Sequence, residues 1–411
     1  MNILIFNAYY TPEVAASMYL EEDIAFGFAN AGHHVLMYVP TPCRGIDDEI
    51  RNKYKHIKEE KYCDGRLVIK RYPLIKENNN VMLRALRYIL QNIKQYLLGI
   101  QEKDIDVIFC GSTPPTQGLV CSLIKKMLKK RYGKNVRFVF NLQDIFPDSL
   151  VAAGLAKQGS IVWKIGRVIE NKVYESADRI IVISESFKKN LMDKNVPVSK
   201  IQVVHNWIDT KKVKPVEKKN NVLFEEYNIS RNKYTVVYAG NFGVAQGAEI
   251  VILAAEKMKQ IDDIQFVIFG GGNNFNEARN TVQRLNLKNV FIYPLLSQER
   301  VSEVYSMGDV ALITCKKGFG VAGMPSKTWS IMACNTPILA SFDENSELAK
   351  IICESGMGEC IEPENLDLLV ETLLRWYKNT AAVTLMGRQY VEVNASKEFC
   401  ISQYCDAIYG D

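Results

Sequence analysis

The sequence predicts an α/β protein of two doubly wound domains, each a parallel sheet with helices on both faces. Strand-length apolar runs rich in β-branched residues alternate with helix-length segments along almost all of the 411 residues. Uninterrupted apolar strands are typical of parallel sheets that are buried on both faces. The pattern stops in the polar stretch 214–233 and then starts again, which indicates a second domain.

The first domain is expected over residues 1–213. Its first strand, NILIFNA, has no basic segment before it and is too short for the apolar core of a signal peptide, so we interpret it as structure. The strands predicted for this domain are 2–8, 34–40, 68–73, 106–110, 137–142, 179–184 and 202–206.

The second domain is expected over residues 214–394, and the last segment, 395–411, is predicted to pack back on the first domain. Its predicted strands are 235–241, 265–271, 290–294, 310–315 and 337–341. In doubly wound sheets the ligand site lies at the carboxyl ends of the strands. We therefore expect a cleft between the two domains at these ends, and the chemistry in the loops that line it.

Composition excludes several classes of protein. The net charge of +5 is too small to indicate nucleic-acid binding, and no stretch reaches the roughly 18 apolar residues of a membrane span. The ten cysteines form no Cys-x-x-Cys pair and have no histidines at metal spacing. A reduced, cytoplasmic protein without structural zinc is the expectation.

Two loops of the first domain carry candidate residues for an acceptor. The loop after the first strand contains Glu13 and then Ala15, Ala16 and Ser17, whose exposed amides are suited to an anion. The loop after the strand RFVFNL contains Asp144 and Asp148. A carboxylate there can hydrogen-bond a sugar hydroxyl or take its proton. The alternatives are a surface loop with a helix cap and an Asx turn that leads into a helix.

In the second domain, two strand ends are candidates for binding a donor. The stretch YAGNFGVAQG leaves its strand through glycines that allow close approach of a phosphate, a weak signal by itself. The stretch FGGGNNF is not a dinucleotide fingerprint, because Phe275 stands at the third glycine position and the next strand ends without an acid. Tyr293 and Pro294 stand where a base could rest, although Tyr293 fits a packed strand end equally well.

The strongest signal is a lysine in the first turn of a short apolar helix. Gly318, Gly320 and Gly323 precede Pro325, which suits the first position of a helix, and then Ser326 and Lys327. A cation is unfavourable at a helix N-terminus. A bound diphosphate would reverse this, because it would pair with the ammonium and accept from the free amides. The alternative is a solvated lysine at the edge of the helix.

The strand PILAS is followed by Glu344 and Glu347, either of which could bridge two ribose hydroxyls. One of them could instead cap the next helix, and Glu347 fits a capping box. The Asp-x-Asp at 104–106 precedes its strand and so lies at the wrong end of the sheet for a metal site; we interpret it as a turn.

Together these pieces resemble the retaining nucleotide-sugar glycosyltransferases of family 4, which have the GT-B fold with two Rossmann-like domains. The likeness covers nearly the whole chain. The combination of YAGNFGVAQG with MPSKTWSIMACN is most similar to the O-antigen and capsule branch that includes N-acetyl-L-fucosamine transferases. The segments that carry the family likeness are FANAGHHV, SADRIIVISESFKKNL, KIQVVHNWID, VVYAGNFG, GDVALI and MACNTPILAS.

Two departures from the family pattern change the expected site. The family's Glu-x7-Glu motif would fall on Ala322 and Ser330, and its two diphosphate-binding cations fall on Asn241 and Gln246. Lys327 is then the remaining cation. The resemblance thus implies a donor site in which Glu344 or Glu347 meets the ribose and the amides around the glycine loop meet the sugar. The full donor set is Asn241, Gly243, Gln246, Tyr293, Pro294, Gly320, Val321, Ala322, Gly323, Met324, Pro325, Ser326, Lys327, Glu344 and Glu347.

The resemblance implies transfer of a hexosyl group, often a 6-deoxy N-acetyl sugar, from UDP to a hydroxyl of an undecaprenyl-diphosphate-linked saccharide. No metal and no cofactor are expected. Retaining transferases of this fold react on one face of the donor, so Lys327 would serve the diphosphate while Asp144 and Glu13 orient the acceptor. The alternatives are a partner subunit that binds the nucleotide sugar without catalysis, and an epimerase or hydrolase of UDP-N-acetyl sugars.

A lipid-linked acceptor implies a surface that meets the membrane. The helix 81–100 carries an apolar stripe with cations beside it, and 122–137 is strongly basic. Together they could form an interfacial basic helix pair. The alternative for each is a helix packed on the sheet with a solvated polar face.

Overall fold

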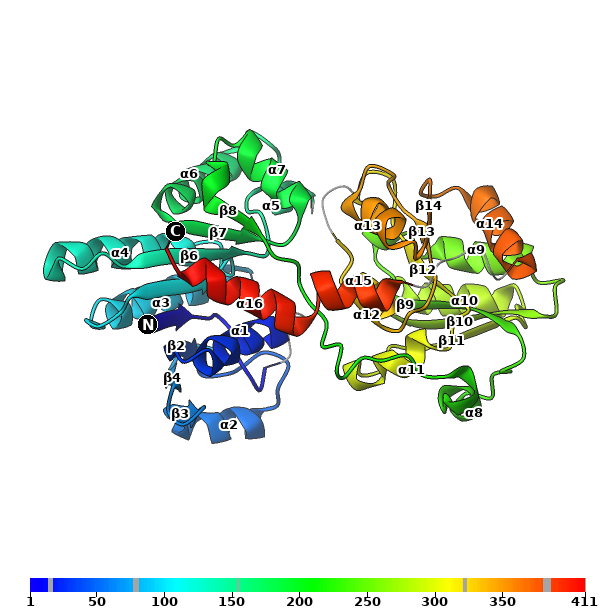
Figure 1. The fold of residues 1–411 in the computed structure, drawn as a ribbon, viewed down its shortest axis with the longest axis horizontal. Coiled ribbons are helices and arrows are strands. Elements are labelled where there is room, and N and C mark those ends of the chain that lie inside the picture. Colours follow the sequence, from blue (N-terminus) through cyan, green and yellow to red (C-terminus); the bar gives the residue numbers. More distant parts are fainter. Residues whose placement is uncertain are drawn as a thin grey trace. The chain divides into compact units, whose positions relative to one another are not determined.

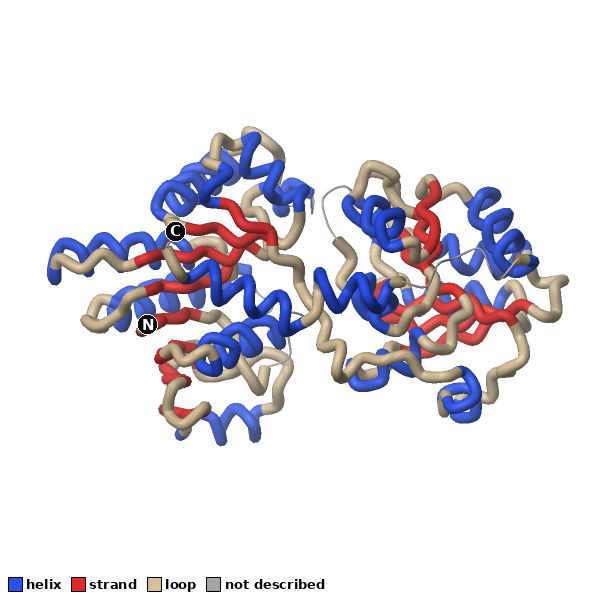
Figure 2. Tube along the Cα trace, viewed as in Figure 1, coloured by secondary structure: helices blue, strands red, loops and turns tan. Residues whose placement is uncertain are grey.

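The computed structural model describes residues 1–13, 18–76, 81–152, 154, 156–320, 324–379 and 386–410. The chain divides into two compact units, Met1–His205 with Cys400–Asp411, and Asn206–Phe399. Each unit is an α/β domain around one sheet, and Figure 2 shows both sheets between helices. The two doubly wound domains expected from the alternating pattern are thereby confirmed.

Unit 1 contains an eight-stranded sheet with the order β3-β4-β2-β1-β5-β6-β7-β8 (Figure 1). Only β3 runs antiparallel, in a hairpin with β4. The strands are β1 (Asn2–Phe6), β2 (His34–Pro40), β3 (Glu59–Tyr62), β4 (Leu67–Tyr72), β5 (Val107–Gly111), β6 (Arg137–Leu142), β7 (Arg179–Val182) and β8 (Ile201–Val203). The helices are α1 (Met18–Asn30), α2 (Asp48–His56), α3 (Val81–Gly99), α4 (Gln117–Tyr132), α5 (Asp148–Ala152), α6 (Ile161–Ser176) and α7 (Glu185–Asp193), with η1 (Val198–Lys200).

Unit 2 contains a six-stranded parallel sheet with the order β11-β10-β9-β12-β13-β14. Its strands are β9 (Tyr234–Asn241), β10 (Ile264–Gly271), β11 (Val290–Pro294), β12 (Val310–Thr314), β13 (Ile338–Ser341) and β14 (Gly358–Ile361). Its helices are α8 (Leu223–Glu226), α9 (Glu249–Lys257), α10 (Phe275–Arg284), α11 (Val301–Tyr305), α12 (Lys327–Ala333), α13 (Glu347–Ser355), α14 (Leu366–Lys378) and α15 (Gly387–Asn394), with η2 (Lys218–Asn220), η3 (Val244–Gln246) and η4 (Gln298–Arg300). Helix α16 (Lys397–Ile408) begins in unit 2, and its residues from Cys400 onward belong to unit 1.

Alternate residues of each strand in unit 2 enter two separate cores. Val236 and Tyr238 of β9 pack with α9, α10 and α14, whereas Val237 and Ala239 pack with α12, α13 and α15. Burial on both faces explains why the strands read as continuous apolar runs. The short α12 is held against the sheet by Trp329, Ile331 and further buried apolar side chains.

Aspartates at the amino ends of three strands anchor their neighbours. Asp106 accepts from the backbone amide of Asn2 at 2.8 Å, and Asp178 accepts from Phe138 at 2.6 Å. In unit 2, Asp309 accepts from Thr235 at 2.7 Å and pairs with Lys218. Each carboxylate satisfies an amide at the start of the neighbouring strand. Asp106 of the Asp-x-Asp therefore has a structural role at the end of the sheet away from the candidate loops.

This anchor yields a prediction for unit 2. Asp309→Ala leaves the amide of Thr235 and the ammonium of Lys218 without the carboxylate, so the free energy of unfolding should fall by about 1–3 kcal/mol. Urea unfolding measures it. The matched control is Glu362→Ala, which removes a carboxylate paired with Lys317 on the surface. Equal losses in the two variants would contradict the anchoring role.

Candidate functional site

Lys327 directs its ammonium to the carboxyl end of β9. Its Nζ atom is buried and has no hydrogen-bond partner, and it lies 4.2 Å from the centroid of the Tyr238 ring. A methyl group at Gly240 would lie only 2.5 Å from this atom, so the ammonium needs a residue without a side chain there. The alternative of a solvated lysine is therefore wrong.

The helix itself contributes less than the sequence indicates. Helix α12 begins at Lys327 rather than at Pro325 and ends at Ala333, and Ser326 precedes it with no side-chain cap. Two turns carry only a small dipole, because the effect grows from aligned peptide units. The attraction for an anion at this edge of the sheet consequently rests on the lysine more than on the helix amides.

The electrostatic state of Lys327 follows from its burial. Desolvation lowers the pKa of its ammonium to about 7. Among the described residues no carboxylate forms an ion pair with it. The contact with the Tyr238 ring is a partial compensation, worth about 2 kcal/mol in desolvated sites. An oxyanion placed beside Nζ would restore the charged form.

The loop after β9 surrounds the same point. A methyl group at Gly243 would lie 2.6 Å from Gln246 Oε1 and 2.9 Å from Asn241 Nδ2, so both amide side chains flank this glycine. The Tyr238 hydroxyl donates to the Asn241 carbonyl at 3.1 Å. Tyr238 thus contacts the Lys327 ammonium with its ring and the Asn241 carbonyl at the start of this loop with its hydroxyl.

The glycine loop before α12 is held by a carboxylate that sequence reasoning missed. Asp343, two residues after the end of β13, accepts from the amide of Gly318 at 2.9 Å and from that of Gly320 at 2.7 Å. The Gly320 amide is therefore already engaged. In the sequence, Asp343 could have been noticed as the acidic residue between the strand PILAS and Glu344. Met324 and Pro325 are half-buried, Ser326 is exposed, and Val321, Ala322 and Gly323 lie outside the described residues.

Three further donor candidates are Tyr293, Pro294 and Glu344, and no contact between them and Lys327 is seen among the described residues. The Tyr293 ring packs 4.3 Å from that of Tyr227, and its hydroxyl donates to the Tyr227 carbonyl at 3.3 Å, which agrees with a packed strand end. Pro294 and Glu344 are exposed.

Helix α13 corrects one detail of the sequence interpretation. Ser346 is its N-cap and accepts from the amide of Ala349 at 3.2 Å. Glu347 is the first helical residue and is half-buried. A capping box needs its acid two residues later, so the capping-box assignment of Glu347 is wrong.

In unit 1, Glu13 ties two loops together. Its carboxylate accepts from the amide of Tyr10 at 3.0 Å and from those of Cys43 and Arg44 at 2.8 and 3.0 Å. The loops after β1 and β2 are therefore joined through one buried side chain. Ala15, Ala16 and Ser17 lie outside the described residues.

The two aspartates after β6 have different surroundings. The loop of Asp144 is held by Ser112, whose hydroxyl accepts from the Gln143 and Asp144 amides at 3.1 and 3.2 Å. Burial of part of the side chain raises the pKa of the Asp144 carboxyl above its ordinary value. Asp148 instead pairs with Lys194 at 2.8 Å, in a contact between α5 and the end of α7.

A second titratable group at this edge, Glu21, was missed by sequence reasoning. It lies in the first turn of α1, and the Asn7 amide donates to its carboxylate at 3.2 Å. A methyl group at Gly111, the last residue of β5, would lie 3.0 Å from Glu21 Oε1. Burial raises the pKa of this carboxyl to about 7. An acid early in the helix after the first strand was the available signal.

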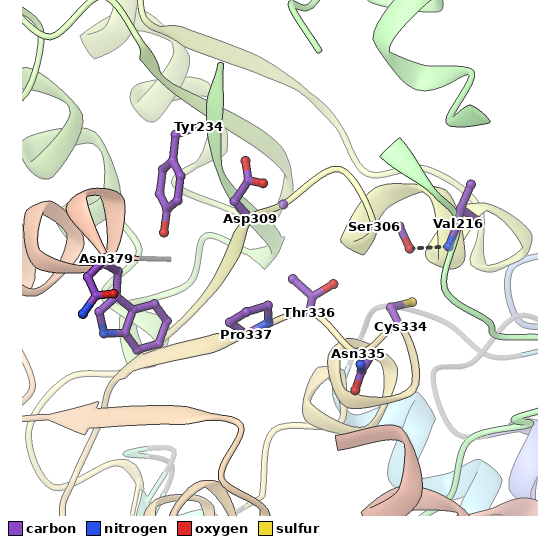
Figure 3. A pocket seen from close by; sticks show the side chains of 11 residues that line it. Val216, Tyr234, Ser306, Asp309, Cys334, Asn335, Thr336, Pro337 and Asn379 are labelled. Atoms are coloured by element: carbon purple, nitrogen blue, oxygen red, sulfur yellow. Dashed lines mark hydrogen bonds between the residues drawn. The ribbon is translucent and has the colours of Figure 1, made fainter. Parts of the chain in front are cut away.

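A hollow of about 310 Å³ opens at the opposite end of the unit 2 sheet (Figure 3). Its lining includes Tyr234, Asp309 and Pro337, which stand at the amino ends of β9, β12 and β13. Thr336 donates to the Tyr305 carbonyl and Ser306 accepts from the Val216 amide. The hollow is distinct from the Lys327 constellation, and these polar groups already have partners.

Over the described ranges, no three His, Cys, Asp or Glu side chains gather as metal ligands. Within the same ranges, no helix has the length and apolar character needed to cross a bilayer.

The burial of Lys327 predicts a pH-dependent stability. Between about pH 7, the pKa in the folded protein, and about 10.5, the ordinary value, the unfolded chain binds more protons, so stability should rise with pH. Below pH 7 Lys327 is protonated in both the folded and the unfolded chain, so the full free-energy cost of burying its charge is present. The stabilisation of Lys327→Met over the wild type, measured by urea unfolding, should shrink from pH 7 to 9 by up to about 1.4 kcal/mol per unit. Lys350→Met, a surface control, should show a constant difference. A constant difference for Lys327→Met would refute the burial.

Comparisons with known proteins place this geometry in a family. The model of "Glycosyltransferase Family 4" matches residues 22–212, and that of "Glycosyl transferases group 1" matches residues 219–391. WcaI of Escherichia coli, named as a colanic acid biosynthesis glycosyl transferase, is 26% identical over the full length of both chains. WbjE of Pseudomonas aeruginosa, named as a glycosyltransferase, is 27% identical over 68% of each chain.

The solved structures agree in fold. HepE of Anabaena, determined in complex with UDP and glucose, superposes with a TM-score of 0.69 at 13% identity, over 99% of this chain and 98% of that one. Two family models that divide the chain between its two units, together with two doubly wound sheets, lead to one conclusion. The chain belongs to glycosyltransferase family 4 with the GT-B fold and is a hexosyltransferase.

Proposed function

We propose that this enzyme transfers a hexosyl group from a UDP-sugar to a hydroxyl of a lipid-linked saccharide, with retention, in the synthesis of an O-antigen or capsule polysaccharide. The observation that carries the proposal is the buried ammonium of Lys327, which has no partner at the carboxyl end of β9. The leaving diphosphate would complete this constellation.

The donor half of the reaction needs charge neutralisation at one point. The bond between the sugar's C1 and the diphosphate oxygen breaks while the acceptor oxygen bonds to C1 on the same face, and the acceptor's proton passes to the leaving phosphate. Lys327 stabilises the charge that develops on this diphosphate. Asn241 and Gln246, whose amides flank Gly243 in the loop after β9, would add neutral hydrogen-bonding groups. Neither needs to act as a nucleophile.

On the acceptor side, the proposal gives positioning roles to the acids. Asp144 keeps an exposed edge and an elevated pKa, which suits a hydrogen bond to a sugar hydroxyl. Glu13 acts by fixing the loops around it, since its oxygens already accept from three amides. Asp148, paired with Lys194, supports the Asp144 loop from the helix that follows.

The names of relatives support the substrate class. WcaI is named for colanic acid biosynthesis, and HepE was determined with UDP and glucose. The sequence likeness to the O-antigen and capsule branch adds the proposal that the transferred sugar is a 6-deoxy N-acetyl hexosamine such as N-acetyl-L-fucosamine. Thermal-shift screening of UDP, GDP and dTDP sugars, followed by transfer to a lipid-linked acceptor, tests this. The proposal would be contradicted if only GDP or dTDP sugars raised the melting temperature of the protein, or if the donor were turned over without an acceptor.

The role of Lys327 predicts a selective loss. Lys327→Ala should weaken UDP binding by roughly ten- to a hundredfold, because a charge-assisted contact disappears, and should change uridine binding little. Isothermal calorimetry with both ligands measures the difference. Lys350→Ala removes a surface lysine of the same unit and should bind both ligands as the wild type does. Equal losses for UDP and uridine in Lys327→Ala would contradict the assigned role.

We further propose that unit 1 docks on an anionic membrane. Helix α3 lies beside α4, and α4 beside α6. The apolar side chains exposed on α3 and α6 are Met82, Leu83, Leu86, Ile89, Leu90, Ile93, Leu97, Ile161, Val162, Ile165 and Val168. Helices α3 and α4 contain no Asp or Glu, and α4 exposes Lys126, Lys129, Lys130 and Arg131. Apolar area with a basic rim fits the interface of anionic lipids.

Flotation with vesicles of phosphatidylcholine, with and without phosphatidylglycerol, tests this surface. The wild type should float with the anionic vesicles, and a Leu86→Ser/Ile93→Ser double variant should bind them less, since apolar area is lost. The matched control is Leu253→Ser/Val393→Ser, which removes exposed apolar side chains of unit 2. Docking through α3 would be ruled out if the fraction of protein that floats did not depend on the anionic lipid. Equal losses of vesicle binding in the two double variants would also rule it out.

A further inference from the structure

Helix α3 has its polar side turned inward. Its fully buried side chains are Arg87, Gln91 and Gln95, which are four residues apart and share one stripe. Every exposed residue of α3 whose side chain is described is apolar. A helix packed on a sheet ordinarily buries its apolar stripe and exposes its polar one. The outward side is explained by a lipid surface, whereas the inward polar stripe needs a separate explanation.

Arg87 is a buried cation that contacts no carboxylate directly, although the Glu13 carboxylate binds the amide of Cys43, whose sulfur the guanidinium approaches. Its Nε donates to the Ile75 carbonyl at 3.3 Å and one terminal nitrogen approaches Cys43 Sγ at 3.5 Å, while Nη1 has no partner. The guanidinium lies 5.3 Å from the centroid of the Tyr9 ring. Among the described residues it forms no ion pair. Such a charge is costly to bury unless an anion joins it.

The two glutamines add further unsatisfied groups to the stripe. Neither the oxygen nor the nitrogen of the Gln91 amide has a partner. Gln95 donates to the Tyr72 hydroxyl at 3.2 Å, but its Oε1 has no partner. Buried polar atoms of native proteins are nearly always paired with protein or ordered water, so the unpaired atoms of this stripe leave hydrogen-bonding capacity for a polar ligand. The donors suit phosphate oxygens, and the acceptors suit sugar or phosphate hydroxyls.

The stripe lies on the side of the sheet where an acceptor is expected. Tyr9, Cys43 and Ile75 follow β1, β2 and β4, so Arg87 stands at the carboxyl ends of these strands. Arg44, an exposed residue whose amide is bound by Glu13, places its guanidinium 5.0 Å from the same Tyr9 ring. A second cation at the surface thus marks the approach to the buried one.

We propose that the stripe of Arg87, Gln91 and Gln95 is a binding site for the phosphoryl group of the acceptor. The inference rests on the proposed function, in which the acceptor is lipid-linked. The outer side of α3 would meet the lipid while its inner side holds the anionic group that joins lipid and sugar. Helix α3 then orients the acceptor from the membrane inward. Arg87 is a binding residue and takes no part in bond making.

Binding of inorganic pyrophosphate and of farnesyl diphosphate tests the site. Both are measured by calorimetry in a Lys327→Ala background, so that the proposed donor site does not contribute. We expect both to bind, the lipid diphosphate more tightly, and Arg87→Met to weaken both by roughly tenfold or more. Arg66→Met, which removes an arginine at the turn between β3 and β4, is the matched control and should bind both normally.

Three results would overturn the site. These are equal binding by Arg87→Met and its background, equal losses in Arg66→Met, and binding of farnesyl diphosphate without any binding of pyrophosphate, which would indicate the apolar outer side alone. Gln91→Leu serves if Arg87→Met does not fold, and it should weaken both ligands without loss of stability. UDP binding by the unaltered enzyme is a separate readout, so failure of the donor assignment is distinguishable from failure of this site.

Discussion

The contact between the buried ammonium of Lys327 and the ring of Tyr238 defines the candidate site at the carboxyl end of β9. The ammonium fits there only because Gly240 has no side chain, and it rests on the ring of Tyr238. The same tyrosine holds the Asn241 carbonyl at the start of the next loop. A cation in this position is unfavourable for the empty protein and favourable with an anion bound. Preorganisation of this kind places stabilisation where charge develops in a reaction.

Most of the fold could be predicted from the sequence, because strands buried on both faces are continuous runs of apolar residues. The strands that were not predicted lack such a run. Strand β3 is the charged run EEKY at the edge of its sheet, paired on one side only. Strand β14 has only four residues and is mostly half-buried. Short or edge strands are defined by the neighbour they pair with, and a single sequence does not contain that neighbour's position.

Lys327 could be singled out from the sequence because a cation in the first turn of α12 breaks a local rule. Carboxylates that bind backbone amides of distant loops leave no such sign, so Glu13 read as a candidate acid although its oxygens are occupied. The inverted α3 shows the same limit. Its two stripes are visible in the sequence, but the stripe that faces the sheet is decided by tertiary packing, and the buried side is that of Arg87 and Gln91.

The three amides bound by Glu13 have a consequence for how such an enzyme can diverge. Glu13 binds amides of both the loop after β1 and the loop after β2, so lengthening or redirecting one loop would disturb the other. A change in the shape of this edge of unit 1 would therefore involve both loops together. Kinetic defects in variants of Glu13 would accordingly report a loosened scaffold and say nothing about proton transfer.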